Sequence, residues 1–175
     1  MPVVIALMGL PGSGKTSVAE RLVRTPELSV VSRDAIRAAM FQPCRFTERE
    51  KQCAYRALLL AVAACLELGR SCVIDGMTFS RAREVDEVRR IAEDAGAHFL
   101  PVFLDCPLDV AQARAVRDVA DHHRASEDRD GGLVARVAKR FEAPPADALR
   151  VDATRTPEEI AKAILDRLDL KTVEF

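Results

Sequence analysis

Gly9-Leu10-Pro11-Gly12-Ser13-Gly14-Lys15-Thr16 fits the pattern G-x-x-x-x-G-K-[ST] and determines the fold that we expect. An apolar run, Val3–Met8, precedes this stretch, and a segment of helical composition, Thr16–Val23, follows it. In such a strand, loop and helix, the glycines let backbone N–H groups turn toward one centre, where the helix N-terminus adds positive potential. We therefore expect the loop to bind phosphate groups; the alternative is a glycine-rich turn without a ligand.

The last two residues of this loop, Lys15 and Thr16, predict that a nucleotide binds together with a metal ion. Lys15 is expected to reach the β- and γ-phosphate oxygens of ATP, and the Thr16 hydroxyl to ligate Mg²⁺. The residues of this segment expected to bind ATP are Gly9, Leu10, Pro11, Gly12, Ser13, Gly14, Lys15, Thr16 and Ser17.

Outside the loop, apolar runs of strand length alternate with segments of helical composition. The expected strands are Val3–Met8, Leu28–Val31, Cys72–Ile74, Phe99–Leu104 and Leu149–Val151. Strands that alternate with helices predict a parallel sheet covered by helices on both faces. Because the 175 residues contain no linker rich in Gly, Ser or Pro, we expect a single domain over residues 1–175.

Two helix starts carry clear capping signals. Thr47 with Glu50 predicts a capping box before a long helix that ends at Leu68, ahead of Gly69. Thr156-Pro157-Glu158-Glu159 predicts a cap, a first-turn proline and a capping carboxylate for the last helix. The apolar residues of the long helix recur at steps of three and four and are expected to form one buried face: Cys53, Ala54, Leu58, Ala61, Val62, Cys65 and Leu66.

Composition narrows the possible partners and compartment. The formal net charge of −1 disfavours a dedicated polynucleotide-binding protein, since such proteins usually carry a basic surplus. The apolar run Pro2–Leu10 lacks a basic flank and is too short for a signal peptide or a membrane span. The five cysteines contain no C-x-x-C pair, so we expect buried, reduced thiols and a cytoplasmic protein; they are Cys44, Cys53, Cys65, Cys72 and Cys106.

A second candidate site follows the second expected strand, in Ser32-Arg33-Asp34-Ala35-Ile36-Arg37. Asp34 and Arg37 are three residues apart and so share one face at the start of a helix, beyond the carboxyl end of a strand, where ligands bind in open α/β sheets. There Asp34 can accept the proton of an attacking hydroxyl, and Arg37 can hold the acceptor. The alternative is a helix-start aspartate with an exposed arginine partner.

Asp75 closes the third expected strand and is a further candidate metal or acceptor residue. A carboxylate at this position can hold Mg²⁺ through water or contact the acceptor. The alternative is a turn formed by Asp75-Gly76.

With Gly69-Arg70-Ser71-Cys72-Val73-Ile74-Asp75-Gly76, these motifs resemble the AAA_33 group of P-loop kinases, which is related to zeta toxins, the polynucleotide kinase domain and adenylylsulfate kinases. The resemblance implies a three-layer α/β/α P-loop NTPase fold whose five-stranded parallel sheet has the order 2-3-1-4-5. It also implies transfer of the γ-phosphoryl group of ATP. In these families the residue matching Asp34 is a general base or a second-sphere magnesium ligand, and the one matching Arg37 binds the acceptor.

The same resemblance implies further site residues. Thr78 and one of Arg81 and Arg83, of which Arg81 is preferred, are expected to contact the acceptor. Thr154, after Arg140-Phe141-Glu142-Ala143-Pro144, is expected to lie near the adenine. Adenylylsulfate kinases carry Asp-Gly-Asp where this chain has Ser32-Arg33-Asp34, so we do not expect sulfate activation.

A charged stretch without apolar periodicity, residues 118–132, is expected to form a mobile lid. It follows a predicted helix, Asp109–Arg117, in which Arg114 and Arg117 share a face. By resemblance these are catalytic lid arginines that stabilise the transferring phosphoryl group, the alternative being a solvated face. Arg124 and Arg129 are further candidates, and His122-His123 is expected to face solvent rather than to bind metal.

We therefore expect an ATP- and Mg²⁺-dependent kinase that phosphorylates a hydroxyl of a small molecule such as a nucleoside, sugar or antibiotic. The alternatives are a 5′-hydroxyl polynucleotide kinase and a nucleotide-hydrolysing switch protein. Asp34 and Arg37 argue against a switch, because a switch needs no base for an acceptor. The segments expected to line the acceptor pocket, Phe41–Phe46 and Met77–Arg83, contain no recognisable code for its identity.

Overall fold

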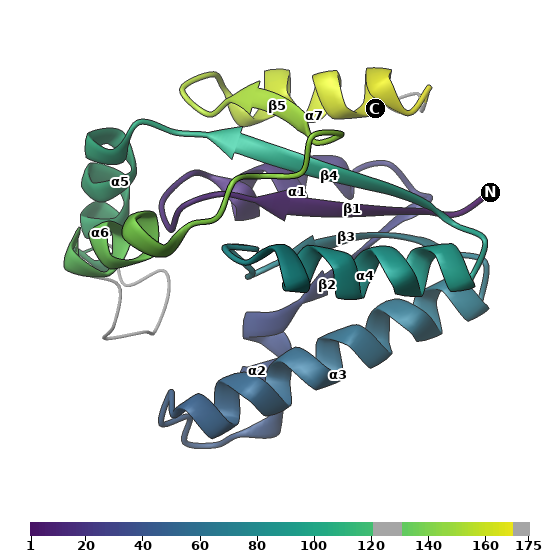
Figure 1. Ribbon diagram of the computed structural model, residues 1–175, viewed down its shortest axis with the longest axis horizontal. Coiled ribbons are helices and arrows are strands. Elements are labelled where there is room, and N and C mark those ends of the chain that lie inside the picture. Colours follow the sequence, from purple (N-terminus) through teal and green to yellow (C-terminus); the bar gives the residue numbers. More distant parts are fainter. Residues whose placement is uncertain (121–130, 170–175) are drawn as a thin grey trace.

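Five parallel strands form the centre of the molecule in the order β2-β3-β1-β4-β5 (Figure 1). The computed structural model describes residues 1–120 and 131–169. The strands are β1 (Val3–Met8), β2 (Leu28–Ser32), β3 (Ser71–Asp75), β4 (His98–Asp105) and β5 (Leu149–Asp152). The predicted fold class and strand order are confirmed, and each predicted strand is correct to within one residue at either end.

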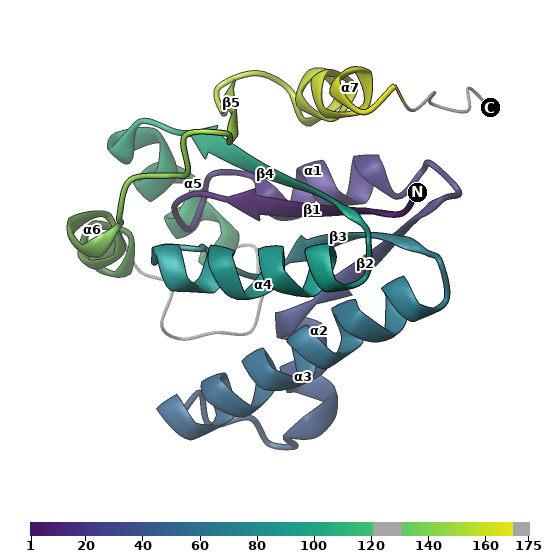
Figure 2. The same cartoon turned by 45° about the vertical axis from the view of Figure 1, so that its right-hand side comes forward.

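Helices cover both faces of the sheet (Figure 1; Figure 2). They are α1 (Lys15–Leu22), α2 (Arg33–Met40), α3 (Glu48–Glu67), α4 (Ala82–Asp94), α5 (Leu108–Ala120), α6 (Gly131–Arg140) and α7 (Pro157–Arg167). Side chains of β1 alternate between two cores because successive residues of a strand point to opposite faces. Val3, Ile5 and Leu7 pack in the core beneath α1 and α7. Val4, Ala6 and Met8 pack in the core beneath α3 and α4.

Both predicted capping boxes are present. The Thr47 Oγ1 accepts a hydrogen bond from the Glu50 N–H at 3.2 Å, and the Glu50 carboxylate accepts one from the Thr47 N–H at 3.1 Å. Thr156 and Glu159 make the same pair of bonds at 3.3 and 3.0 Å. Each box satisfies backbone donors that the first helical turn leaves without a partner, so both helices begin where the sequence predicts.

The buried face of α3 is narrower than predicted. Ala54, Leu58, Val62 and Leu66 are its buried residues, at regular steps of four. Ala61 and Cys65, each one position before this row, are half-buried against the same core, whereas Cys53, in the first two turns of the helix, is exposed. The predicted burial of Cys53 was wrong.

All five cysteines are free thiols, but only Cys72 and Cys106 are buried. Burial raises the pKa of Cys72 to about 12 and also raises the pKa of Cys106, since an apolar environment disfavours the thiolate. The expectation of uniformly buried thiols therefore holds for these two residues alone.

The predicted lid, residues 118–132, overlaps the ends of two helices. Residues 118–120 continue α5, which meets no Gly or Pro there, and residues 131–132 begin α6, a helix that the sequence analysis did not predict. Residues 121–130, and with them His122, His123, Arg124 and Arg129, lie outside the described residues. Over the described ranges, none of the helices is long and apolar enough to cross a membrane.

The core beneath α3 can be tested with two leucines on the same helix. Leu58 is completely buried, whereas Leu60 is 73% exposed. Leu58→Ala is expected to lower the free energy of unfolding by about 2 to 5 kcal/mol, because it removes buried methyl groups and leaves a cavity. Leu60→Ala should change it by no more than about 0.5 kcal/mol. Urea unfolding of both variants measures the difference, and equal losses would contradict the assigned helix face.

Candidate active site

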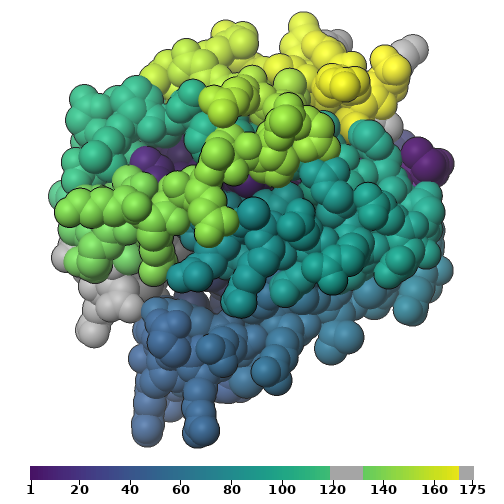
Figure 3. Space-filling view, viewed as in Figure 1, coloured from purple at the N-terminus to yellow at the C-terminus, as the bar shows by residue number. Residues whose placement is uncertain are grey.

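The carboxyl ends of β1, β2 and β3 meet at one edge of the sheet, where a cleft of about 400 Å³ opens. The phosphate loop follows β1, Asp34 follows β2, and Gly76 follows β3, and all of them line the cleft. α6 and the start of α3 supply its outer walls (Figure 3). The sequence thus brings the two predicted sites, the phosphate loop and the Asp34 cluster, into one cavity.

The phosphate loop packs directly against α5. Gly12 has a φ of +82°, and a Cβ atom at this position would overlap the carbonyl oxygen of Ala111. The N–H of Gly9 donates to the carbonyl oxygen of Thr78 at 3.1 Å, which joins the loop to the segment after β3. The loop is therefore held from both sides by elements distant in sequence.

Lys15 is the first residue of α1, and its largely buried side chain reaches back into the loop. Its ammonium group donates to the carbonyl oxygens of Gly9 at 2.9 Å and Leu10 at 2.7 Å, and to the Ser13 hydroxyl at 3.3 Å. Hydrogen bonds between two charged groups are stronger than those to neutral oxygens. A phosphate group in the loop can therefore draw the ammonium group away from these carbonyls.

Thr16 and Asp75 meet at the base of the cleft. The Thr16 hydroxyl donates to the two carboxylate oxygens of Asp75 at 2.9 and 3.1 Å, and Asp75 is buried. A hydroxyl and a carboxylate are the hard oxygen ligands that Mg²⁺ prefers. Among the described residues there is no group of three or more His, Cys, Asp or Glu side chains that could hold a metal ion alone. These two residues fit Mg²⁺ that keeps several water or phosphate oxygens, as this ion commonly does.

Asp34 lies next to this pair. A Cβ atom on Gly76, the residue after Asp75, would stand 3.2 Å from the Asp34 carboxyl carbon, so the end of β3 and the start of α2 approach each other closely. Of the three predicted metal residues, Thr16 and Asp34 line the cleft, and Asp75, which is hydrogen-bonded to Thr16, is not among the described residues that line it.

Asp34 and Arg37 share one helix face, as predicted. The Arg37 guanidinium donates to Asp34 Oδ1 at 3.1 Å, and that of Arg33 approaches the same oxygen at 3.4 Å. The Arg37 side chain is only 8% exposed, and its guanidinium carbon lies 4.6 Å from the centre of the Phe46 ring. This burial excludes the alternative of an exposed arginine partner.

Several further predicted residues line the cleft or lie beside the phosphate loop and β5. Ser17 and Thr78 line the cleft. Arg114 lies beside the loop at Gly14 and donates to the Ala153 carbonyl oxygen at 2.9 Å, which connects α5 to the segment after β5. Thr154, in that segment, is exposed, and its hydroxyl hydrogen-bonds with Asp152 Oδ1 at 2.7 Å.

The structure does not place Arg81 or Arg117 in the cleft. Arg81 is exposed at the start of α4, Arg117 is exposed on α5, and neither is among the described residues that line the cavity. Neither the resemblance that suggested Arg81 nor the spacing that suggested Arg117 determines which way a helix face turns in the folded chain.

Sequence reasoning missed the cationic side chains Lys51 and Arg140 and the apolar Leu133 and Val137, all of which line the cleft. Lys51 lies in the first turn after the Thr47 cap, and the other three belong to α6. The one usable signal was the capping box, which places Lys51 at the exposed start of a helix.

The residues that follow α6 are held by the start of α4 and by β4. The Glu142 carboxylate accepts a hydrogen bond from the Ala82 N–H at 2.7 Å, and the Glu142 N–H donates to the Ser80 carbonyl oxygen at 3.0 Å. The ring centres of Phe141 and Phe103 are 5.8 Å apart. These contacts fix the position from which Arg140 faces the cleft.

The chain matches a known protein family and is similar to several kinases. A family profile named AAA_33, described as an AAA domain, matches residues 4–145. The chain is 28% identical to adenylyl-sulfate kinase of Saccharomyces cerevisiae over 175 residues, covering 94% of this chain and 82% of the relative. It is 27% identical to the bifunctional enzyme NodQ of Azospirillum brasilense over 178 residues, but spans only 28% of that protein's length.

A solved structure is similar over nearly the whole chain. The Mycobacterium tuberculosis APS kinase CysC, in complex with AMPPNP and APS, superposes with a TM-score of 0.72 and 26% sequence identity, covering 96% of this chain and 98% of that one.

The packing of Gly12 against α5 predicts how the phosphate loop responds to one added methyl group. Gly12→Ala is expected to displace the loop and to weaken binding of Mg²⁺-ATP by roughly tenfold or more, measured by calorimetry, because the loop's backbone donors lose their common centre. Gly96→Ala is the matched control, since Gly96 also has a positive φ, +64°, but no atoms near its missing Cβ. It should lose about 1 to 2 kcal/mol of stability and keep its affinity for ATP. Unchanged ATP affinity in Gly12→Ala would show that the loop does not hold the nucleotide.

Proposed function

The chain belongs to the AAA_33 family and is a P-loop kinase, and from this premise we propose that it transfers the γ-phosphoryl group of Mg²⁺-ATP to a hydroxyl group of a small molecule. One observation carries the proposal: Asp34 lines the same cleft as Lys15 and Thr16. A carboxylate for the acceptor's proton and a binding site for the phosphates thus face the same space. A protein that only hydrolyses nucleotide as a switch has no need of this carboxylate.

We assign the phosphates of ATP to the loop, where Lys15 and the backbone N–H groups offer positive charge and donors. Thr16 would ligate Mg²⁺ directly, and Asp75 would hold it directly or through water. The ion supplies neutralisation of phosphate charge. We assign the adenine to the side of β5, because Arg114 joins the loop region to Ala153, beside Thr154.

The acceptor is then assigned to the opposite side of the loop, toward β3 and β2. Asp34 accepts the proton of the acceptor hydroxyl as its oxygen forms a bond to the γ-phosphorus and the bond to the β-phosphate oxygen breaks. Arg37 keeps this carboxylate in place through the 3.1 Å hydrogen bond and is itself packed against Phe46. Asp34 is therefore aligned before the acceptor arrives.

The acceptor need not be the one named for the relatives. Adenylylsulfate kinases carry Asp-Gly-Asp where this chain has Ser32-Arg33-Asp34, and Arg33 lines the cleft, so the acceptor pocket differs next to the proposed base. The net charge of −1 favours a small acceptor over a polynucleotide.

A test of the activity combines radiolabelled ATP with a panel of hydroxyl compounds that includes 5′-hydroxyl oligonucleotides. Label is expected on a small molecule. Lys15→Ala should reduce its transfer by roughly a hundredfold or more, because it removes the charge that meets the transferring group. Lys162→Ala, an exposed lysine of α7, serves as the control with the same change of charge. Wild-type transfer by Lys15→Ala, or label found only on oligonucleotides, would overturn the proposal.

The role of Asp34 is tested separately. Asp34→Asn is expected to lower kcat by about two to four orders of magnitude while the KM for ATP changes little, since a general base acts in the transition state. Asp166→Asn, at an exposed aspartate of α7, should leave both constants unchanged. If Asp34→Asn instead weakens only ATP or Mg²⁺ binding, then Asp34 is a metal-site residue and another group takes the proton.

A further inference from the structure

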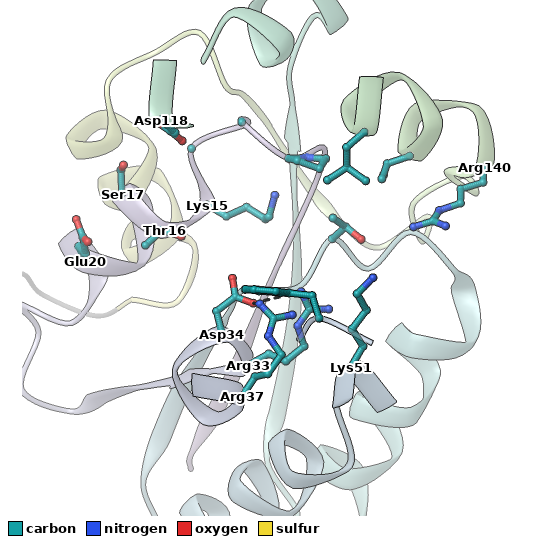
Figure 4. Close-up of a pocket in the computed structure, with 18 residues that line it drawn as sticks. Lys15, Thr16, Ser17, Glu20, Arg33, Asp34, Arg37, Lys51, Asp118 and Arg140 are labelled. Carbon is teal, nitrogen blue, oxygen red and sulfur yellow. Dashed lines mark hydrogen bonds and ion pairs between the residues drawn. The ribbon is translucent and has the colours of Figure 1, made fainter. Parts of the chain in front are cut away.

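The cleft has two halves of opposite charge character. Its acidic side chains other than Asp34 are Glu20 and Asp118, and both lie on the phosphate-loop side (Figure 4). On the other side, Figure 4 shows cationic side chains from three helices directed toward the same space. They are Arg33 and Arg37 of α2, Lys51 of α3 and Arg140 of α6.

The carboxylates near these cations do not balance them inside the cleft. Arg33 and Arg37 both approach the same oxygen of Asp34. Lys51 pairs with Glu48 at 2.9 Å, but the Glu48 side chain is 81% exposed and does not line the cavity. Within the described part of the chain, Arg140 makes no ion pair. The acceptor half thus contains four cationic side chains and one carboxylate.

Arg140 and Lys51 face each other across the opening. The pKa of Glu48 is lowered first by its hydrogen bond to Lys51 and by the charge of Lys51, and also by the charge of Arg140. Arg140 therefore acts on the start of α3 although it belongs to α6, on the opposite wall of the cleft (Figure 4). An anion between the two walls would meet a charge on each side.

The cleft also has apolar lining residues, which favour a small organic molecule over solvent. Phe46 packs on Arg37, Leu133 and Val137 belong to the same helix as Arg140, and all three line the cleft and offer apolar contacts. Cations gathered in a partly enclosed cavity repel one another and lose hydration, so an anionic ligand stabilises the arrangement. The phosphates of ATP do not meet this need, because the loop on the other side already provides their donors.

We propose that the acceptor carries a compact oxyanion, such as a carboxylate, phosphate or sulfate, in addition to its hydroxyl group, and that Lys51 and Arg140 bind this group from opposite walls. The inference rests on the proposed kinase function and narrows its substrate class. Lys51 and Arg140 are specificity residues in this account. Arg33 and Arg37 stay with Asp34, which leaves the hydroxyl end of the acceptor beside the base.

Anion binding can be measured without knowing the acceptor. The protein is first saturated with Mg²⁺ and AMPPNP, so that the phosphate loop is occupied, and is then titrated with inorganic sulfate, phosphate or acetate in a calorimeter. One of these ions is expected to bind, and Lys51→Ala and Arg140→Ala should each weaken its binding by about tenfold or more. Arg49→Ala and Lys139→Ala are matched controls, because these exposed residues lie on the same helices and do not line the cleft. Which ion binds best distinguishes the three oxyanion classes.

Absence of anion binding, or equal loss in the control variants, would overturn the inference. The same ions are also titrated without nucleotide, where the phosphate loop can bind them too; a loss of binding in Lys51→Ala and Arg140→Ala then separates their site from the loop. Failure of the kinase function would appear instead as no labelled product from any hydroxyl compound. Transfer to glucose that equals transfer to glucuronate, glucose 6-phosphate and glucose 6-sulfate would overturn the inference while the kinase function stands. With an anionic acceptor, Arg140→Ala should raise the acceptor KM about tenfold and change kcat little.

Discussion

The hydrogen bonds of the Lys15 ammonium group to the carbonyl oxygens of Gly9 and Leu10 are the interaction on which the rest of the site depends. They hold the chain in a closed turn between β1 and α1, and this turn needs a glycine at position 12, because α5 passes too close for a side chain. The loop thereby fixes where α5 lies, and its bond to Thr78 fixes the end of β3. Phosphate binding would replace these hydrogen bonds to neutral carbonyl oxygens with stronger bonds between charged groups. The loop is therefore already folded around the place where an anion would bind.

A second arrangement, built on Asp34, gives the cleft its other function. Arg33 and Arg37 converge on one carboxylate oxygen, and Phe46 covers Arg37. The carboxylate therefore has a defined position close to the end of β3, next to the Thr16 and Asp75 pair. Phosphate loop and base are placed by different strands of one rigid sheet, and their relative position follows from the parallel pairing of β1, β2 and β3. In our proposal, Asp34 is the base and the cationic walls beyond it determine which hydroxyl compound fits.

Local sequence signals predicted most of this architecture. The phosphate loop, the strands and the two capping boxes depend on residues close together in the sequence, so they can be predicted from the sequence alone. Lys51 and Arg140 were missed because they meet only after α3 and α6 are placed on opposite walls. Arg81 was favoured by resemblance, yet its helix start points to solvent. Cys53 was also missed: it repeats the spacing of the half-buried Ala61 and Cys65 but lies near the start of α3, where it is exposed.

A crystal structure with Mg²⁺ and AMPPNP is the most direct test of whether the loop binds the nucleotide. It would show which atoms Lys15 and Thr16 contact once their present hydrogen bonds are broken. We expect the Lys15 ammonium group to leave the carbonyl oxygens of Gly9 and Leu10 for phosphate oxygens. We also expect the Thr16 hydroxyl to turn from Asp75 to the metal, while Asp34 stays on Arg37 and faces the γ-phosphate. A nucleotide bound outside the loop, or Lys15 still on the two carbonyls beneath a bound nucleotide, would contradict this expectation.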